Sequence, residues 1–223
     1  FDQTNDGPLG KQREFVPHHQ RPCNTLAWNP INSNYLAAGL EKARSAGVSL
    51  FLWDITSNTL NVGTSSGPHE KQRSSTNVSI RSGLSSFSSE GREAGPTYET
   101  TSLAWFRTEP ATLIAGQGGK YLKIFDIRDQ PELQLKPKTF TNTKAVYGVC
   151  VDPNFEYRVA SFVEGDQGAV LVWDIRHFEK PLLALPGENV VQIEWNPTRS
   201  GLLASLRKDA NVVHLHDIQH GSA

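Results

Sequence analysis

The chain has 223 residues, of which 37% are hydrophobic and 20% charged, and its formal net charge at pH 7 is −1. This length and apolar content allow a sizeable buried core, and the balanced charge argues against a nucleic-acid-binding stripe or an acidic solvating tail. No stretch approaches the run of about 18 or more apolar residues that marks a transmembrane helix, and the first residues lack the pattern of a secretory signal.

The sequence contains two cysteines and no methionine. Cys23 and Cys150 have no Cys-x-x-Cys partner, so we expect two reduced thiols packed within strands, which fits a reducing compartment. Because methionine is missing even at position 1, we interpret the chain as an excerpt of a longer protein.

The first third of the chain divides into a leading loop, one repeat unit and an insertion. Residues 1–14 are polar and unpatterned, and a strand pattern then indicates a unit at about 15–55. Residues 56–96 contain eleven serines, five glycines and few large apolar side chains. Such a segment cannot bury enough surface to offset its ordering entropy, so we predict a disordered insertion. Its stretch Lys-Gln-Arg-Ser-Ser at 71–75 would suit a basophilic kinase, and a solvated, unregulated loop is the alternative.

Three further units follow at about 97–130, 138–178 and 181–220, and residues 221–223 form a tail. All four units end in an apolar strand that closes on a ring, an aspartate and an isoleucine. These endings are Trp53-Asp54-Ile55, Phe125-Asp126-Ile127, Trp173-Asp174-Ile175 and His216-Asp217-Ile218. A unit that repeats at roughly 40–45 residues is typical of propeller blades.

A second strand pattern precedes each of these endings and runs into a turn. It closes on Trp28, Trp105, Val151 and Trp195, and a short strand of small residues separates it from the ring–Asp–Ile ending. Short strands at even spacing predict an all-β fold of stacked, four-stranded antiparallel sheets. We therefore expect four blades of a larger β-propeller, a ring of about seven blades. We also expect Trp28, Trp105, Trp173 and Trp195 to be largely buried, because each lies in an alternating strand pattern.

Two stretches have some features of a metal-binding or phosphate-binding site. His214 and His216 alternate on one strand face, as two metal ligands would, but His216 occupies the ring position of the repeat and we interpret it as a packed ring. The stretch 116–119, Gly-Gln-Gly-Gly, links two short strands with no helix after it, so we predict a hairpin turn and no phosphate site.

We predict no catalytic, cofactor-binding or metal-binding residue in this chain. A ligand site in a propeller channel needs polar residues that converge from several blades, whereas Gln192 and Glu194 stand isolated among apolar inner-strand residues. The blade-end aspartates are expected to cap strand ends by accepting N–H bonds from the following turn. These structural residues are Asp54, Asp126, Asp174 and Asp217.

The repeat resembles the WD-repeat superfamily, and particular stretches are similar to the propeller of the Mio (missing oocyte) family. Asn-Thr-Lys-Ala-Val at 142–146 and Phe-Glu-Lys-Pro at 178–181 are not required by a generic WD repeat. The similarity lapses through the serine-rich insertion, and Phe125 and His216 depart from the usual tryptophan. The remaining matching stretches are 14–18, 23–30, 36–40, 151–153, 158–162, 164–165, 196–204 and 216–220.

This resemblance implies a non-enzymatic scaffold, a subunit of the GATOR subcomplex 2, called the SEA complex in fungi. Such a subunit has other subunits as partners and needs no cofactor, nucleic acid or transmembrane segment. The resemblance further implies positive regulation of the target-of-rapamycin kinase complex by amino acids, and a cytoplasmic protein recruited to the lysosomal or vacuolar surface. The alternatives are a WD-repeat adaptor of another complex and a propeller with a small-ligand site in its channel.

Overall fold

The computed structural model describes residues 21–42, 49–54, 98–127, 138–141, 144–163, 169–208 and 210–218. The predicted leading loop, 1–14, the serine-rich insertion, 56–96, and the tail, 221–223, lie outside these residues, as does the stretch 71–75.

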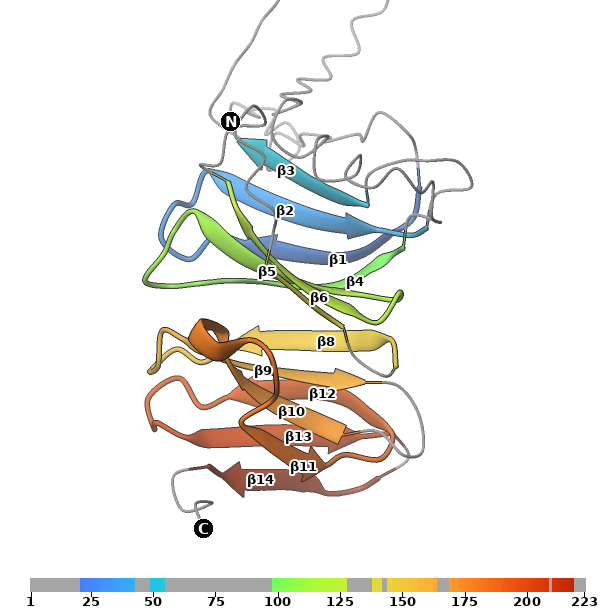
Figure 1. The fold of residues 1–223 in the computed structure, drawn as a ribbon, viewed down its shortest axis with the longest axis vertical. Coiled ribbons are helices and arrows are strands. Elements are labelled where there is room, and N and C mark those ends of the chain that lie inside the picture. Colours follow the sequence, from blue (N-terminus) through green and yellow to red (C-terminus); the bar gives the residue numbers. More distant parts are fainter. Residues whose placement is uncertain are drawn as a thin grey trace, which may run out of the picture.

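In this part of the chain, fourteen strands form four antiparallel sheets stacked in chain order (Figure 1). The first sheet has strands β1 (Cys23–Trp28), β2 (Tyr35–Leu40) and β3 (Leu50–Asp54). The second has β4 (Thr100–Trp105), β5 (Thr112–Gln117), β6 (Tyr121–Asp126) and β7 (Lys138–Thr141). The third has β8 (Val146–Val151), β9 (Arg158–Val163), β10 (Ala169–Asp174) and β11 (Leu183–Pro186). The fourth has β12 (Val190–Trp195), β13 (Leu202–Arg207) and β14 (Val213–Asp217).

The predicted all-β propeller architecture is confirmed, but two sheet boundaries differ from the expected ranges. Lys138–Thr141 pairs with β6 and so completes the second sheet, and Leu183–Pro186 pairs with β10 and completes the third. Our units at 138–178 and 181–220 each began with the outer strand of the preceding sheet. Each sequence repeat is therefore shifted by one strand relative to the sheet. The chain adds an outer strand to one sheet before it enters the first strand of the next.

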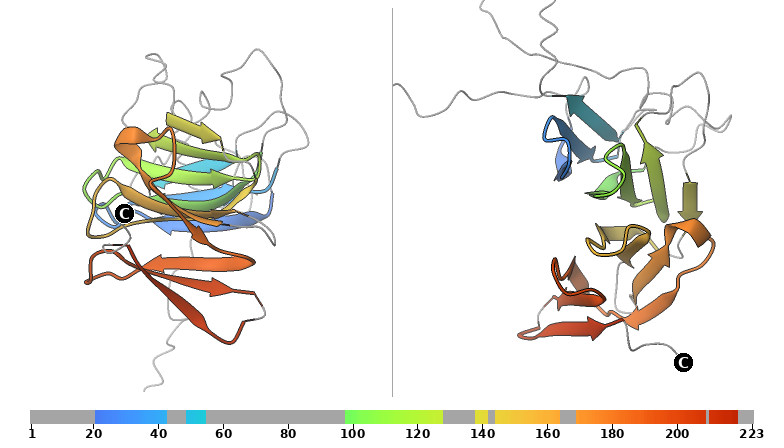
Figure 2. Two further views of the ribbon diagram at one scale, coloured as in Figure 1. Left: turned by 60° about the horizontal axis from the view of Figure 1, so that its bottom comes forward. Right: turned by 90° about the vertical axis from the view of Figure 1, so that its left-hand side faces the viewer.

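The first strands of the four sheets lie next to one another in the stack (Figure 2), since β1 contacts β4, β4 contacts β8 and β8 contacts β12. Each of these strands has a register shift near its start. Each shift is a β-bulge, in which one extra residue is inserted into the first strand. In two sheets this residue hydrogen-bonds to the next sheet: Asn24 donates to the Thr100 carbonyl at 3.3 Å, and the Thr101 hydroxyl donates to the Val146 carbonyl. The bulges thus join successive sheets along their inner edges.

The core consists of three clusters, one between each pair of neighbouring sheets. Leu50 and Leu52 of β3 pack with Trp105 of β4 in the first cluster. The second cluster joins the second and third sheets around Trp173, and the third joins the third and fourth sheets around Trp195. The free energy of unfolding of such a stack is approximately the sum of the stabilities of the single sheets and of the interfaces between neighbouring sheets.

The four tryptophans predicted to be buried do not behave alike. Trp105, Trp173 and Trp195 are 5%, 0% and 4% exposed, whereas Trp28 is 56% exposed, and the prediction was wrong for Trp28. Trp105 and Trp195 end the first strands of their sheets and pack onto the preceding sheet. Trp28 occupies the same position in the first sheet, where the described residues contain no preceding sheet to cover it.

The glycine-rich stretch at 116–119 closes the hairpin between β5 and β6, as predicted. The Lys120 amide donates to the Gln117 carbonyl at 3.2 Å, and Lys120 has a φ of 72°. A Cβ at Gly119 would lie 2.1 Å from the Tyr98 ring, so the close approach of this ring requires glycine.

Candidate interaction surface

In the third and fourth sheets, the ring that closes the sheet is hydrogen-bonded to the second strand of the same sheet. Trp173 is opposite Val159, and its indole N–H donates to the Ser161 hydroxyl at 2.9 Å. His216 is opposite Leu203, and its Nε2 pairs with the Ser205 hydroxyl at the same distance, 2.9 Å. His216 thus takes the place of the tryptophan as a packed ring, as we predicted.

Burial lowers the pKa of His216, with smaller contributions from His214 and Arg207, so this ring favours its neutral form. Phe125, which has no N–H group, is opposite Leu113, and Ala115 occupies the position of the hydroxyl.

The expected capping role of the blade-end aspartates is confirmed at Asp174. Its Oδ1 accepts from the Arg176 amide at 2.9 Å, and its Oδ2 accepts from Arg176 Nη2 at 2.6 Å. These hydrogen bonds hold the pKa of Asp174 below its ordinary value. Asp217 instead lies 3.6 Å from Arg199 Nη2, and Asp126 ends β6 opposite Thr112. The side chain of Asp54, at the end of β3, lies outside the described atoms.

Four similar turns follow the first strands and lie on one side of the stack, the left side in Figure 1. In each turn the amide of the first residue donates to the carbonyl of the seventh. The distances are 2.9 Å for Asn29 to Tyr35, 3.0 Å for Phe106 to Thr112, 2.9 Å for Asp152 to Arg158 and 2.8 Å for Asn196 to Leu202. In three of the turns the first side chain also accepts amides of the turn through its Oδ1, at Asn29, Asp152 and Asn196. The Asn-Pro pairs at 29–30 and 196–197 and the Asp-Pro pair at 152–153 therefore mark one recurring turn structure.

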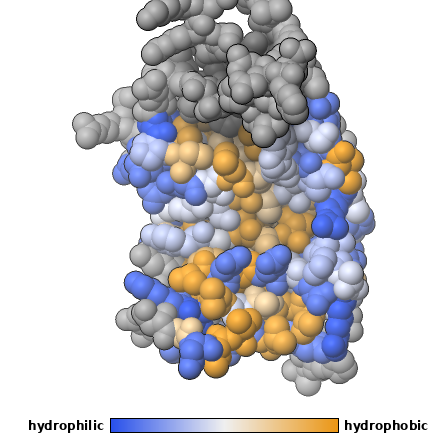
Figure 3. Space-filling model, turned by 180° about the vertical axis from the view of Figure 1, so that it is seen from behind, coloured by the Kyte–Doolittle hydropathy of each residue, from blue (hydrophilic) through white to orange (hydrophobic). Residues whose placement is uncertain are grey.

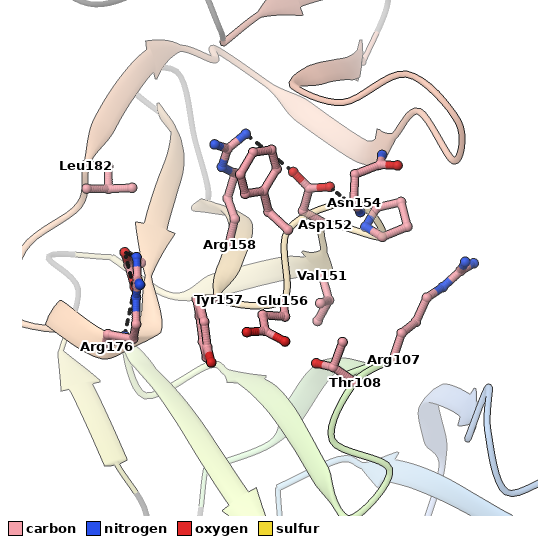
Figure 4. Close-up of a pocket in the computed structure, with 13 residues that line it drawn as sticks. Arg107, Thr108, Val151, Asp152, Asn154, Glu156, Tyr157, Arg158, Arg176 and Leu182 are labelled. Carbon is pink, nitrogen blue, oxygen red and sulfur yellow. Dashed lines mark hydrogen bonds and ion pairs between the residues drawn. The ribbon is translucent and has the colours of Figure 1, made fainter.

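A groove of about 470 Å³ lies beside the third of these turns (Figure 4). Arg107 and Thr108 line it from the turn between β4 and β5, whereas Tyr157 and Arg158 line it from the turn between β8 and β9. Arg176, from the short 3₁₀ turn Ile175–His177 after β10, lines a further part of the wall.

Two arginines in this groove stack on aromatic rings. The Arg158 guanidinium lies 4.0 Å from the centre of the Phe155 ring and 3.5 Å from the Asp152 carboxylate. The Arg176 guanidinium lies 4.6 Å from the centre of the Tyr157 ring and is bound by Asp174. Each ring is thus fixed by a guanidinium that a carboxylate holds in place.

The sequence analysis did not single out Phe155, Tyr157 or Arg158. The available signal was a pair of aromatic residues at the fourth and sixth turn positions, where the other three turns have polar or small residues. Their meeting with Arg176, which follows a different strand, depends on how the chain folds back at the end of β10.

Both ends of the stack present apolar side chains to solvent. Leu26 and Trp28 of β1 are exposed at the first sheet, and Val213 and Leu215 of β14 at the fourth. Figure 3 shows apolar surface over the fourth sheet at the lower end of the molecule. These are the faces that neighbouring blades of the expected larger ring would cover.

Gln192, Glu194 and the two cysteines, all within the described residues, do not form one site. Gln192 is opposite Leu206 and Glu194 is opposite Ala204, and both are exposed. Cys23 and Cys150 are free thiols; Cys23 is exposed and not packed as expected, whereas burial, with the charges of Asp152 and Glu194, raises the pKa of Cys150 well above its ordinary value.

The described ranges, 21–218 with their gaps, contain no group of three His, Cys, Asp or Glu residues placed to hold a metal ion. In the same ranges, no helix has both the length and the apolar composition needed to cross a membrane.

Comparison with known proteins gives a consistent family match. The sequence model of the MIOS WD40-repeat family matches residues 7–223. The chain is 43% identical over 210 residues to the GATOR2 complex protein MIOS of Danio rerio, and 45% identical over 211 residues to GATOR2 complex protein MIOS-A of Xenopus laevis. Each match covers 93% of this chain and 22% of the relative, so the chain spans about a fifth of the length of these proteins.

The fold also has solved counterparts. A chain from the structure entitled "COPII on membranes, outer coat vertex" superposes with a TM-score of 0.61 at 21% sequence identity. The superposition covers 88% of this chain and 46% of the other. At this identity the likeness concerns the propeller fold alone.

Proposed function

The chain belongs to the MIOS WD40-repeat family, and we propose that it is a non-catalytic interaction propeller within an assembly of the GATOR2 type. The relatives are named as proteins of that complex. One structural observation carries the proposal for this chain: the groove beside the third turn presents two partly exposed rings, Phe155 and Tyr157, each stacked on an arginine. Such surfaces suit a protein that works by contact with other protein elements.

The proposal extends to signalling. The assembly would regulate the target-of-rapamycin kinase complex positively in response to amino acids. It would act in the cytoplasm and reach the lysosomal or vacuolar surface through its other subunits. The support for this part is membership of the family, since the relatives are named as proteins of the GATOR2 complex.

A ligand site in the central channel is the other candidate function. It would need polar side chains from several first strands to face one another. Gln192 and Glu194, the polar pair in β12, alternate with the buried Ile193 and Trp195, so they lie on the open face of the fourth sheet. No observation in the described residues favours the channel over the scaffold.

The proposed function is tested in cells that lack the endogenous protein. Full-length protein with Trp173→Ala is expected to lose assembly with its partners and to lose amino-acid-dependent kinase signalling. The ring is fully buried against Phe140, with ring centres 4.2 Å apart, and its removal costs about 3–5 kcal/mol. The readouts are co-purification of the other subunits and phosphorylation of a kinase-complex substrate after amino-acid refeeding.

Glu194→Gln serves as the control, because Glu194 is exposed and has no role in this proposal. It should support assembly and signalling at the wild-type level. Loss of signalling from Glu194→Gln, at normal abundance and with normal assembly, would favour the channel site over the scaffold.

A further inference from the structure

The four recurring turns provide an internal comparison for the aromatic pair in the third one. All four close with the same hydrogen bond from the first to the seventh residue. Phe155 and Tyr157 occupy the fourth and sixth positions of the third turn. The residues at these positions elsewhere are Asn32 and Asn34, Glu109 and Ala111, and Arg199 and Gly201. The turn therefore forms without aromatic rings, and its backbone does not explain why the third turn has two.

Packing does not explain these rings either. Phe155 is 45% exposed and Tyr157 is 40% exposed, and neither belongs to the three core clusters. Both border the groove, as does Leu182, which is also exposed. Exposed aromatic and arginine side chains in a concave site are the residues that most often dominate binding between proteins.

The rings are held in place before any partner arrives. Arg158 and Arg176 cover one side of Phe155 and Tyr157, and these arginines are bound by Asp152 and Asp174. The turn itself is fixed to the fourth sheet, because Asn154 donates to the Asn196 carbonyl at 3.1 Å. Fixed side chains lose little conformational entropy when they bind, which favours affinity.

The charges in the groove leave one arginine without a partner. Asp152 and Asp174 are engaged by arginines, whereas the Glu156 carboxylate is hydrogen-bonded to Tyr157, which raises the pKa of Tyr157 and leaves Glu156 negatively charged. Within the described residues, Arg107 on the opposite wall has no acidic partner. Figure 4 shows Arg107 reaching out from the turn between β4 and β5. The groove thus combines an apolar wall with the unpaired positive charge of Arg107 and, beside Tyr157, the negative charge of Glu156.

We propose that this groove docks a segment of a partner protein that places an apolar side chain against Phe155 and Tyr157 and a carboxylate against Arg107. The partner is thus an acidic segment with an aliphatic or aromatic anchor, and not a nucleic acid or a membrane. The proposal rests on the proposed function in that it assigns one contact surface of the interaction propeller.

The test places a photo-crosslinking residue, p-benzoylphenylalanine, at position 155 of the full-length protein in cells. A second version places it at Ile31, which is exposed on the equivalent turn of the first sheet. After irradiation, mass spectrometry identifies the crosslinked peptides. Position 155 is expected to capture one peptide with Asp or Glu close to a large apolar residue, and position 31 is not. Capture of peptides without an acidic residue, or of the same peptides from both positions, overturns the proposal.

Variants in the same background separate recognition from folding. Arg107→Glu and the double change Phe155→Ser with Tyr157→Ser should each lower binding of a synthetic peptide with the captured sequence by about tenfold or more. Ile31→Ser, the matched control, should leave it unchanged. A second peptide has Asn or Gln in place of the acidic residues. It should bind the wild type weakly, with about the affinity that the acidic peptide has for Arg107→Glu. Equal affinity of the acidic and amide peptides for the wild type overturns the assignment to Arg107.

Size-exclusion chromatography of each full-length variant distinguishes this proposal from the proposed function. If the wild type does not enter a larger assembly, the proposed function fails, and peptide binding at the groove still decides the docking proposal. If the wild type assembles and the groove variants bind the peptide normally, the docking proposal alone fails.

Discussion

Trp105 and Trp195 occupy the same position in two successive sheets and differ in one hydrogen bond. Both rings are buried, at 5% and 4% exposure, and both pack onto the preceding sheet. The indole N–H of Trp105 donates to the Ala27 carbonyl of that sheet at 2.9 Å. The indole N–H of Trp195 is buried and has no hydrogen-bond partner in the described part of the chain.

Replacement of each tryptophan by phenylalanine should therefore have unequal costs. The loss of ring area is the same in both variants and cancels in the comparison. Trp105→Phe also loses a hydrogen bond worth about 1 kcal/mol, whereas Trp195→Phe removes an unsatisfied donor that costs about 1–3 kcal/mol to bury. Trp105→Phe is expected to destabilise its interface by about 2–4 kcal/mol more than Trp195→Phe, which at the lower end is roughly a thirtyfold difference in an opening equilibrium.

Amide hydrogen exchange of the full-length protein measures this difference, because it reports the local opening of each interface without requiring two-state unfolding. Protection should fall more in β1 and β4 for Trp105→Phe than in β8 and β12 for Trp195→Phe. Equal losses of protection in the two variants, or a larger loss for Trp195→Phe, would refute the hydrogen-bond reasoning.

Three further predictions concern single positions in the third sheet, each measured by thermal unfolding of the full-length protein. Ser161→Ala should cost about 1–3 kcal/mol, because it leaves the buried indole N–H of Trp173 without its acceptor; an unchanged melting temperature would contradict this. Gly148→Ala should destabilise by about 1–3 kcal/mol, because its Cβ would lie 2.0 Å from the buried ring of Phe162, and wild-type stability would show that this ring can move. Because the pKa of Cys150 is raised by burial, the unfolded chain ionises first and this thiol's contribution falls as pH rises above its ordinary value of 9.0. Cys150→Ala should lose less stability than the wild type between neutral pH and a pH above that value, and identical pH profiles would exclude the effect.

Much of the architecture follows from local sequence. Alternating apolar residues and the Asn-Pro and Asp-Pro turns set the strands, and the ring–Asp–Ile ending sets their repeat. His216 was recognisable as a packed ring because it stands where Trp173 stands, and the structure gives both rings a serine partner. These features depend on residues close together in the chain or on the comparison of one repeat with another. They can therefore be predicted without knowing which sheets are neighbours.

The tertiary structure decided what each strand contacts. Trp28 and Trp105 have the same sequence context, yet only Trp105 has a sheet in front of it in the described residues, so burial followed from the neighbour and not from the motif. The pairing of Lys138–Thr141 and Leu183–Pro186 with the preceding sheets depended on where the chain returns along the outer edge. The groove arises in the same way. Phe155 stacks on Arg158 within the same turn, but Tyr157 stacks on Arg176 because the end of β10 folds back beside that turn. The packing that brings these two segments together acts between parts of the chain that sequence spacing does not relate.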